Sequence, residues 1–521
     1  MPEVQDVDVL ILGGGINGCG TFRDLCAQGV DCLLLERTDF CAGASAGSSR
    51  LMHGGLKYLE TGEFRLVRES AEERNRLLSN AAHYVRPLPS ILPLRSRFGG
   101  IVPSILRFLR IEAKLSDRGS LITRLGLTLY DIYGRNFAAM PRHRMLSRAA
   151  LDRAVPGLDP AIIGAGLYYE GQLSHAERLG LELILDGEAL NPASRALNHV
   201  VVEGQADGIV SYSHGGEAHL VRPKVIVNAG GAWIDRVNAA LGLETRLMGG
   251  SKGAHLVVEN PALFKALNGH MVYFGTADGR VNLAYPFMGR VLIGSTDIKI
   301  DDPDTATCDR DEADYLRGVI AEIFPGIPVS EDQVKFRFSG VRPLPRADGD
   351  IGLVTRDHSV SEQALPCGTP ILCLIGGKWT TFRAFAEMVT DDILHRLDCA
   401  RRCRTDQMQI GGGKGYPRPE DRAAWIDRCA RETGVPRARA AVLLDRYGTR
   451  ASRMAADLGA DQPLQTLPAY SREELLWLIR HERVGSAEDL IRRRTDIAIS
   501  GRLTEAVKAE IEALFAGAAL S

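Results

Sequence analysis

The sequence has no long apolar segment, almost no net charge and no cysteine pattern, and each absence excludes a class of protein. No apolar run approaches the roughly 18 residues that a membrane-spanning helix needs, so any membrane contact is expected to be peripheral. A net charge of -2 predicts no general affinity for nucleic acid. The ten cysteines are scattered without the spacing of zinc sites, so neither a metal site nor a disulfide framework is expected.

The N-terminus also lacks the features of a secretion signal. Its first residues, MPEVQDVDV, carry acids in place of a basic stretch, and the apolar run at residues 7–12 is short. We therefore expect a cytoplasmic protein with reduced thiols. At 521 residues, with 45% hydrophobic and 25% charged side chains, the chain has an ordinary globular composition and is long enough for two or three domains.

The N-terminal residues read as one βαβ unit: a strand at 7–12, a glycine turn, a helix at 16–27 and a strand at 32–35. Gly13, Gly15 and Gly18 form the spacing GxGxxG, which lets backbone amides and a helix N-terminus face a pyrophosphate. Glu36, at the end of the second strand, can accept hydrogen bonds from ribose hydroxyls. A nucleotide site is predicted, with a tight packing turn as the alternative.

Two later glycine turns favour FAD over NAD as the nucleotide. The segments VIVNAGGAW (225–233) and LCLIGGKWTT (372–381) each place glycines after a strand, where backbone could approach a long ligand. If Gly376 and Gly377 open a helix that contains Trp379, its N-terminus could stabilise negative charge on the flavin. An ordinary turn between strand and helix is the alternative for each glycine pair.

The order of the predicted elements indicates an α/β fold with three parts. Strand-like runs with few helices fill the middle of the chain, and the end is charged and helix-prone. We predict a discontinuous Rossmann-like FAD-binding domain, a β-rich substrate domain, a linker and a C-terminal helical domain. Their expected ranges are 1–80, 145–235 and 340–400 for the FAD-binding domain, 81–144 for a basic amphipathic segment, 236–340 for the substrate domain, 401–422 for the linker and 423–521 for the helical domain.

Several motifs together resemble the FAD-dependent glycerol-3-phosphate dehydrogenase family of the D-amino-acid-oxidase-like superfamily. The resemblance runs from about residue 5 to residue 400 and rests on GGGINGCG, SSRLMHGGLKYLETGEFRLVRES, KGAHLVV, GSTD, SGVRPL and IGGKWTTFR. It implies a flavoprotein that oxidises sn-glycerol 3-phosphate to dihydroxyacetone phosphate, passing a hydride to flavin N5 and electrons onward to membrane quinone. The resemblance also implies dissociable, non-covalent FAD.

The same resemblance implies roles for individual residues. His255 matches a substrate-site histidine, and an unperturbed imidazole pKa of about 6.5 suits a general base. Arg342 is assigned to the substrate oxygen and the developing alkoxide, and a buried structural histidine or a solvated arginine is the alternative for each. The expected substrate-binding residues are Lys57 and Arg356 for the phosphate, with Tyr58 and Lys378 in the same pocket. The further cofactor-binding residues are Asn17, Ser48, Ser49, His53, Gly54, Gly55, Gly230 and Thr380.

The sequence departs from the family pattern at three places. Lys57 stands where the family has arginine, NAGGAW replaces NATGPW, and SHAER at 174–178 replaces an acidic segment. Lysine keeps the charge but loses the bidentate geometry, so a longer polyol phosphate such as erythritol 4-phosphate stays open as substrate. An amino-acid or amine oxidase of the same superfamily and a non-catalytic FAD-binding protein also stay open.

Residues 95–135 form a basic amphipathic segment with eight Arg or Lys against three acids. Such a segment can lie in a lipid interface without crossing it, and an internal helix pair with a solvated basic face is the alternative. Because quinone is confined to the membrane, we expect peripheral contact with the cytoplasmic face of the inner membrane. The sequence does not fix the oligomeric state, and a homodimer is compatible with it.

Overall fold

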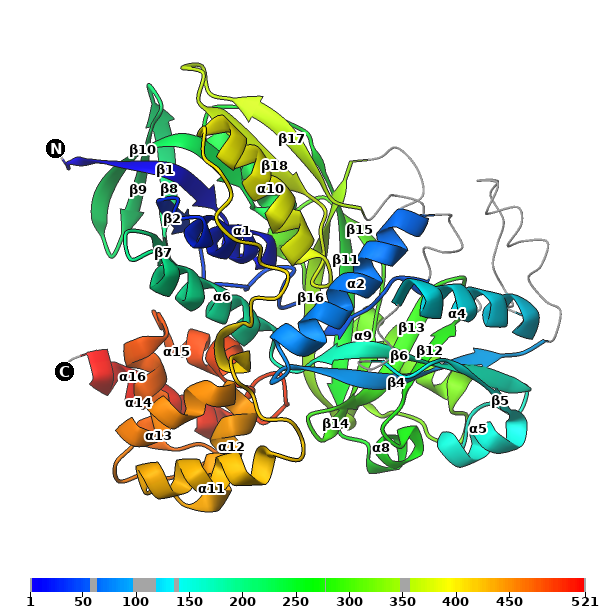
Figure 1. The fold of residues 1–521 in the computed structure, drawn as a ribbon. Coiled ribbons are helices and arrows are strands. Elements are labelled where there is room, and N and C mark those ends of the chain that lie inside the picture. Colours follow the sequence, from blue (N-terminus) through cyan, green and yellow to red (C-terminus); the bar gives the residue numbers. More distant parts are fainter. Residues whose placement is uncertain are drawn as a thin grey trace.

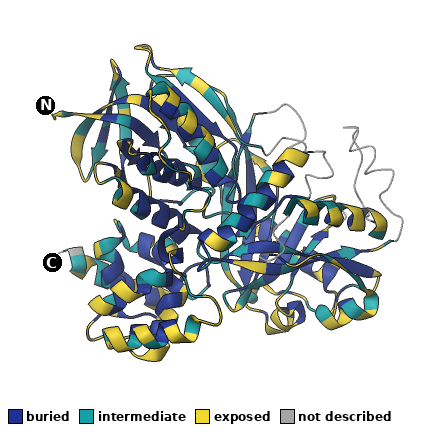
Figure 2. Ribbon diagram, viewed as in Figure 1, coloured by how far each residue is buried: buried dark blue, intermediate teal, exposed yellow. Residues whose placement is uncertain are grey.

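The chain forms two sheets that lie side by side, with a group of helices from the C-terminal part packed below the first sheet (Figure 1). The computed structural model describes residues 2–56, 63–96, 119–134, 140–276, 278–346 and 357–519. Buried residues predominate in the sheets and on the helix faces that pack against them, while exposed residues lie mainly on the outer helix faces (Figure 2). The α/β fold with a helical C-terminal domain is confirmed.

The first sheet is mainly parallel and contains the predicted βαβ unit. Its strands in spatial order are β17 (Ser359–Ala364), β18 (Pro370–Ile375), β10 (Glu217–Asn228), β1 (Val4–Leu12), β2 (Cys32–Leu35) and β7 (Arg195–Leu197), with β9 (Ile209–His214) and β8 (Val201–Ala206) paired onto β10. Apolar side chains of α1 (Ile16–Ala27), α6 (Ala176–Leu190) and α10 (Phe382–Arg396) share one core with one face of this sheet. The short helix α7 (Ile234–Ala240) covers part of the other face. The predicted helix at 16–27 and the strand at 32–35 are confirmed.

The second sheet is mainly antiparallel. Its strands in spatial order are β15 (Ile298–Ile300), β11 (Met248–Val258), β14 (Arg290–Gly294), β13 (Val281–Phe287), β12 (Met271–Gly275), β4 (Val85–Leu94), β6 (Gly164–Leu173) and β3 (Leu51–Met52), with β16 (Val334–Pro345) on β11 and β5 (Arg144–Ser147) on β6. Residues 145–173 were expected in the FAD-binding domain, yet β6 pairs with β4 along its whole length and so joins this sheet.

Helices cover the second sheet on both sides. The core on one face includes α5 (Arg148–Ala154), α8 (Pro261–Leu267) and α9 (Arg310–Ile323), and α9 begins at a capping box formed by Asp309 and Glu312. A smaller apolar cluster joins α2 (Phe64–Asn80) and α4 (Ser120–Gly134) to β4 and β6. This arrangement leaves β11 and β16 directed toward the first sheet, where they reach the cavity described below.

The C-terminal helices have a core of their own. They are α11 (Arg422–Thr433), α12 (Arg437–Tyr447), α13 (Ala451–Asp457), α14 (Arg472–His481), α15 (Ala487–Asp489), the π-helix η8 (Leu490–Arg494) and α16 (Glu505–Ala519). The preceding stretch was expected to be a linker, but its three glycines at 411–413 are buried, Gly411 against α6, Gly412 against the end of α12 and Gly413 against the end of α2. A Cβ on Gly412 would lie 2.2 Å from the carbonyl oxygen of Tyr447, so glycine permits close packing here and does not supply flexibility.

Candidate active site

A cavity of about 830 Å³ lies where the carboxyl ends of β1, β2, β10 and β18 meet β11 and β16 of the second sheet. Ligands of α/β folds bind at the carboxyl ends of parallel strands, where the loops can surround them. The volume falls at the upper part of the range of small-molecule sites, as a dinucleotide requires. Most of the predicted cofactor residues that the structure describes line this cavity.

Glycine is required for different reasons at the three glycine positions of the nucleotide loop. Gly13 has a φ of +113°, and a Cβ on it would lie 2.6 Å from the carbonyl oxygen of Ala229. A Cβ on Gly18 would lie 2.0 Å from the carbonyl oxygen of Gly13, so both positions are explained by packing of the chain on itself. Gly15 has an extended backbone and lines the cavity, where a Cβ would contact Ser45 only at 3.5 Å. The packing alternative therefore accounts for Gly13 and Gly18 but leaves the space in front of Gly15 for a ligand.

Glu36 is fixed in the cavity wall by the backbone around it. Its Oε2 accepts a hydrogen bond of 2.7 Å from the amide of Gly14, and its Oε1 accepts one of 2.8 Å from the amide of Thr38. A carboxylate oxygen can accept more than one hydrogen bond, so Glu36 keeps acceptor capacity toward the cavity that it lines. The role predicted for Glu36, accepting hydrogen bonds from ribose hydroxyls, is compatible with this position.

Gly15→Ala is expected to weaken FAD binding while leaving the fold intact. The new methyl group meets the protein at an ordinary contact distance but occupies the space next to the helix N-terminus, where a pyrophosphate would lie. The methyl group would move the pyrophosphate away from the backbone amides, and the loss of one charge-assisted hydrogen bond corresponds to roughly a 10- to 100-fold rise in the Kd for FAD. Titration of the deflavinated protein with FAD measures this Kd.

Gly18→Ala is the matched comparison for that prediction. Its Cβ meets backbone at 2.0 Å, so this variant should lower the melting temperature of the deflavinated protein. If Gly15→Ala lowered the melting temperature as much, or left the Kd for FAD unchanged, the assignment of Gly15 to the ligand would be wrong.

The second glycine turn is tied to the first glycine loop and to the loop that follows β2. Gly376 and Gly377 have φ values of +75° and +83°, and the side-chain amide of Asn17 donates a 3.1 Å hydrogen bond to the carbonyl of Gly376. The indole of Trp379 donates a 2.9 Å hydrogen bond to the carbonyl of Ser45. Because α10 begins at Phe382, Trp379 lies in the turn before the helix, and the helix does not open at Gly376 as considered above.

The polar loop after β2 also reaches the cavity. Ser48, Ser49 and His53 line it, and the carbonyl of His53 accepts a 3.2 Å hydrogen bond from Thr380. Gly230 lines it as well. Gly54 and Gly55 are not among the lining residues, and the amide of Gly54 donates to the buried hydroxyl of Tyr130 at 2.9 Å. Gly54 therefore contacts neighbouring protein and not the cavity.

His255 lies on β11 in a buried, apolar environment. Its Nε2 is 2.7 Å from the hydroxyl of Ser49, its ring stacks on Phe338 at 4.9 Å, and its Nδ1 is buried without a hydrogen-bond partner among the described residues. Burial lowers the pKa of His255 to about 3, and the nearby charges of Arg342 and Arg50 add to the effect. The ring is therefore neutral at physiological pH, with a pKa well below the ordinary value expected from the sequence.

Arg342 lies on β16 opposite Ser251 of β11 and is held by several groups. One guanidinium nitrogen, Nη1, donates to Ser251 and Asp297 at 3.2 Å, and Nη2 donates to Ser295 at 3.1 Å and to the carbonyl of Thr296 at 3.0 Å. A Cβ on Gly253 would lie 2.3 Å from Nη2, so glycine lets the guanidinium cross β11. Arg342 is 24% exposed and lines the cavity, where it presents a fixed positive charge.

Only one of the four predicted substrate-binding residues is among the residues that the structure describes. Lys57, Tyr58 and Arg356 lie outside the described residues, and Lys378 lines the cavity. The departing segment SHAER is not part of the cavity wall. Its Glu177 forms a buried ion pair with Arg50, which directly follows the cavity-lining residues Ser48 and Ser49. This segment therefore contacts the residues next to the cavity and not the cavity itself.

A charged cluster at the cavity wall was missed in the sequence. Asp304 accepts hydrogen bonds from Arg37 at 3.0 Å and from the indole of Trp233 at 2.7 Å, and it pairs with Arg236. Arg37, Trp233 and Arg236 all line the cavity. Arg37 could have been noticed because it follows Glu36 directly, but no local pattern links it to a residue 267 positions later.

Comparisons with known proteins agree with this geometry. Residues 8–391 match the family described as FAD dependent oxidoreductase, and residues 403–519 match the C-terminal domain of alpha-glycerophosphate oxidase. A solved structure of the glycerol-3-phosphate dehydrogenase from Bacillus halodurans, complexed with FAD, superposes with a TM-score of 0.72 at 23% identity, covering 99% of this chain and 95% of that one. At this identity the likeness establishes the fold.

Two relatives are similar over nearly their whole length. A glycerol-3-phosphate dehydrogenase of Synechocystis sp. is 32% identical over 529 residues, covering 96% of this chain and 90% of that protein. A D-erythritol 1-phosphate dehydrogenase of Brucella abortus is 32% identical over 534 residues, covering 98% of this chain and 97% of that protein.

Proposed function

This chain belongs to the FAD dependent oxidoreductase family, and from that premise we propose that it oxidises sn-glycerol 3-phosphate to dihydroxyacetone phosphate. The observation that carries the proposal is the single cavity in which the nucleotide loop, His255 and Arg342 come together. The substrate is taken from the names of relatives that match along the full chain, such as the Synechocystis enzyme.

Each part of the cavity has a role in the proposed reaction. Bound FAD supplies the acceptor for the hydride that leaves the alcohol carbon. Gly15, Glu36 and the turn at Gly376 would hold the cofactor. His255, neutral and hydrogen-bonded to Ser49, accepts the hydroxyl proton directly or through the Ser49 hydroxyl. Arg342 donates hydrogen bonds to the substrate oxygen as negative charge develops on it.

The phosphate group is proposed to be the main determinant of specificity. Lys57 and Arg356, which lie outside the described residues, are proposed as its charge-assisted donors, with Lys378 in the cavity as a third cation. Sites built for a charged group reject analogues that lack it far more strongly than apolar pockets reject a missing methylene. Neutral glycerol should therefore be a poor substrate.

Anaerobic mixing of the purified holoenzyme with candidate substrates tests the proposal directly. Glycerol 3-phosphate should bleach the flavin absorbance, and glycerol or glycine at the same concentration should not. A protein that isolates without FAD and does not take it up, or that is reduced equally by glycerol and its phosphate, would contradict the proposed function.

A longer polyol phosphate is the second candidate substrate. The Brucella relative, named for erythritol phosphate, is as similar as the Synechocystis enzyme, and Lys57 departs from the family's arginine. The same substrate panel separates the two, because the natural substrate should give the higher kcat/KM of flavin reduction. Lys57→Arg should shift that preference toward glycerol 3-phosphate if the natural substrate is the longer one.

We further propose peripheral membrane contact through α4, with quinone as the electron acceptor. None of the described helices has the length and apolarity to cross a bilayer. On α4, Leu121, Leu125 and Ile132 are 59%, 63% and 53% exposed and lie on one side of the helix. The helix follows the basic residues of the segment 95–135, most of which lies outside the described residues. Apolar and basic groups together are typical of interfacial segments.

The double variant Leu121→Glu/Leu125→Glu is expected to lower binding to anionic lipid vesicles by about tenfold or more, because two exposed leucines would lose their lipid contact. Sedimentation with vesicles measures this effect. Leu190→Glu is the matched control, since Leu190 is 44% exposed on α6. Equal sedimentation of the double variant and the parent would remove α4 from the proposed membrane contact.

A further inference from the structure

Three consecutive arginines in η8, Arg492, Arg493 and Arg494, have three different environments. Arg492 is 43% exposed and pairs with Glu488 on its own helical segment. Arg494 is 1% exposed and binds both oxygens of Asp39, at 2.7 and 2.8 Å. Arg493 is 12% exposed, and it is the one of the three that lines the cavity. A residue of the C-terminal helical domain therefore reaches the site formed by the two sheets.

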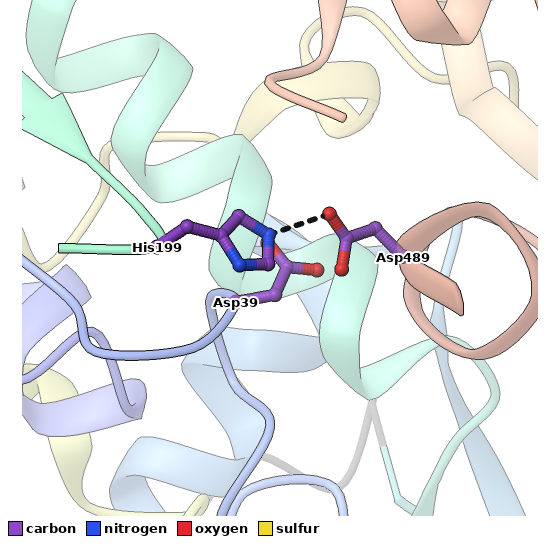
Figure 3. Close-up of side chains that lie close together, drawn as sticks. All are labelled: Asp39, His199 and Asp489. Atoms are coloured by element: carbon purple, nitrogen blue, oxygen red, sulfur yellow. Dashed lines mark hydrogen bonds and ion pairs between the residues drawn. The ribbon is translucent and has the colours of Figure 1, made fainter. Parts of the chain in front are cut away.

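Arg493 is held by the carboxylates of a small cluster. Its Nε donates to Asp39 at 2.6 Å, and its Nη2 donates to Asp489 at 2.8 Å. In Figure 3 the ring of His199 is directed at Asp489, with Asp39 beside them, and the His199 Nε2 lies 2.8 Å from the Asp489 carboxylate. The two hydrogen bonds of Arg493, to Asp39 and Asp489, fix the plane of its guanidinium group, so the side chain has little conformational freedom at the cavity wall.

The grouping of Asp39, His199 and Asp489 could suggest a metal site, but its oxygens are already used. Both oxygens of Asp39 accept from arginines, and Asp489 also accepts from the amides of Gly485 and Ser486. Burial alone would raise the pKa of Asp39, yet the charges of Arg494 and Arg493 hold it down to about 2. Two guanidinium groups at this position would repel a cation, so the cluster is an ion-pair network.

The network lies next to the cavity-lining residues that follow β2. Asp39 follows Glu36 by three residues, in the loop that continues into the cavity wall at Ala42 and Gly43. The backbone on either side is tied down as well, because the amide of His199 donates to the carbonyl of Thr38 at 2.7 Å. The Nη1 group of Arg493 makes no hydrogen bond within the described part of the chain, while Nε and Nη2 do. Since Arg493 lines the same cavity as Glu36, its Nη1 is the guanidinium nitrogen available to a ligand there.

We propose that Arg493 is a cofactor-contacting residue supplied by the C-terminal domain, and that its Nη1 donates a hydrogen bond to an oxygen in the nucleotide half of FAD. The inference rests on the proposed placement of FAD with its ribose at Glu36. It follows that the C-terminal domain contributes to FAD affinity, because it both provides Arg493 and holds Asp39.

Release of FAD from the diluted holoenzyme, followed by flavin fluorescence, tests the proposal. Arg493→Met should raise the Kd for FAD by roughly 10- to 100-fold, the change expected when a charge-assisted hydrogen bond is lost. Arg492→Met is the matched control and should keep the parent's Kd. At saturating FAD, the rate of flavin reduction by substrate should equal the parent's in Arg492→Met, because Arg492 pairs with Glu488 and does not line the cavity.

The melting temperature of the deflavinated protein distinguishes a residue that contacts FAD from one that only stabilises the fold. Arg494→Met breaks a buried ion pair and should lower that melting temperature, whereas Arg493→Met should act mainly on the Kd. If Arg493→Met fails to fold, Arg493→Lys carries the same test, because it keeps the charge but loses the fork. A Kd within about twofold of the parent's would overturn the inference. A parent protein that binds no FAD would instead contradict the proposed function.

Discussion

His255→Gln is expected to slow flavin reduction by substrate about 10²- to 10⁴-fold while FAD stays bound. His255 is the described imidazole that lines the cavity beside Ser49, and its proposed task is to accept the hydroxyl proton. Glutamine can keep a hydrogen bond to Ser49 and a similar volume against Phe338, so the packing should survive. Stopped-flow measurement of flavin bleaching under anaerobic conditions gives the rate, and the flavin spectrum before mixing shows that FAD is retained.

The pH dependence of kcat/KM adds a second test of the same residue. The pKa of His255 is lowered to about 3, so the neutral ring that can accept a proton is already present above that pH. The activity of the free enzyme should therefore not fall between about pH 7 and pH 5 through protonation of His255. Stability should change, because the unfolded ring takes up a proton as pH falls below about 6.5 and the buried ring does not. His255→Gln should accordingly reduce the loss of stability between about pH 6.5 and pH 3.

Ser49→Ala distinguishes a direct base from a relay. If the proton passes through the Ser49 hydroxyl, this variant should lose nearly as much rate as His255→Gln; if His255 acts directly, the loss should be much smaller. Reduction of His255→Gln at the parent's rate would show that His255 is only a buried structural histidine, the alternative considered from the sequence.

The nucleotide half of the site could be predicted because its signals are local. The spacing of Gly13, Gly15 and Gly18 and the position of Glu36 lie within one βαβ unit of fewer than forty residues, and α1 and β2 have the predicted bounds. In such a unit the strand, turn and helix determine where each side chain lies, without help from distant parts of the chain. The structure adds which glycines serve packing and which faces the cavity, a distinction that depends on Ala229 and Ser45 from other segments.

The features that sequence reasoning missed all depend on distant contacts. Arg493 reaches the cavity by pairing with Asp39, which is 454 positions away, and no spacing rule connects them. The three glycines at 411–413 resemble a flexible linker in composition, but they pack closely against α6, α12 and the end of α2, which lie far away in the sequence. The ordinary pKa assumed for His255 failed for the same reason, since burial by the two sheets determines its value.

Arg342, unlike the neutral His255, carries a charge, and the carboxylate of Asp297 balances it. Asp297 accepts from its Nη1 at 3.2 Å, and Ser251 shares that carboxylate through its hydroxyl. Arg342 also donates to two neutral groups, the hydroxyl of Ser295 and the carbonyl of Thr296. This surrounding keeps the guanidinium in one orientation before substrate binds, so no reorganisation is needed when negative charge develops on the substrate oxygen.

Arg342→Ala is therefore expected to slow flavin reduction about 10²- to 10³-fold with FAD still bound, the usual effect of removing one preorganised donor to a developing oxyanion. Arg342→Lys should recover only part of the rate, because lysine restores the charge but cannot reproduce the two-armed contact with Ser251 and Ser295. Asp297→Asn keeps the arginine and loosens its anchor, so its loss should be smaller than that of Arg342→Ala. Stopped-flow rates at saturating substrate rank the three variants. Parent-like reduction by Arg342→Ala, or an equal loss in Asp297→Asn, would show that Arg342 does not act on the reacting oxygen.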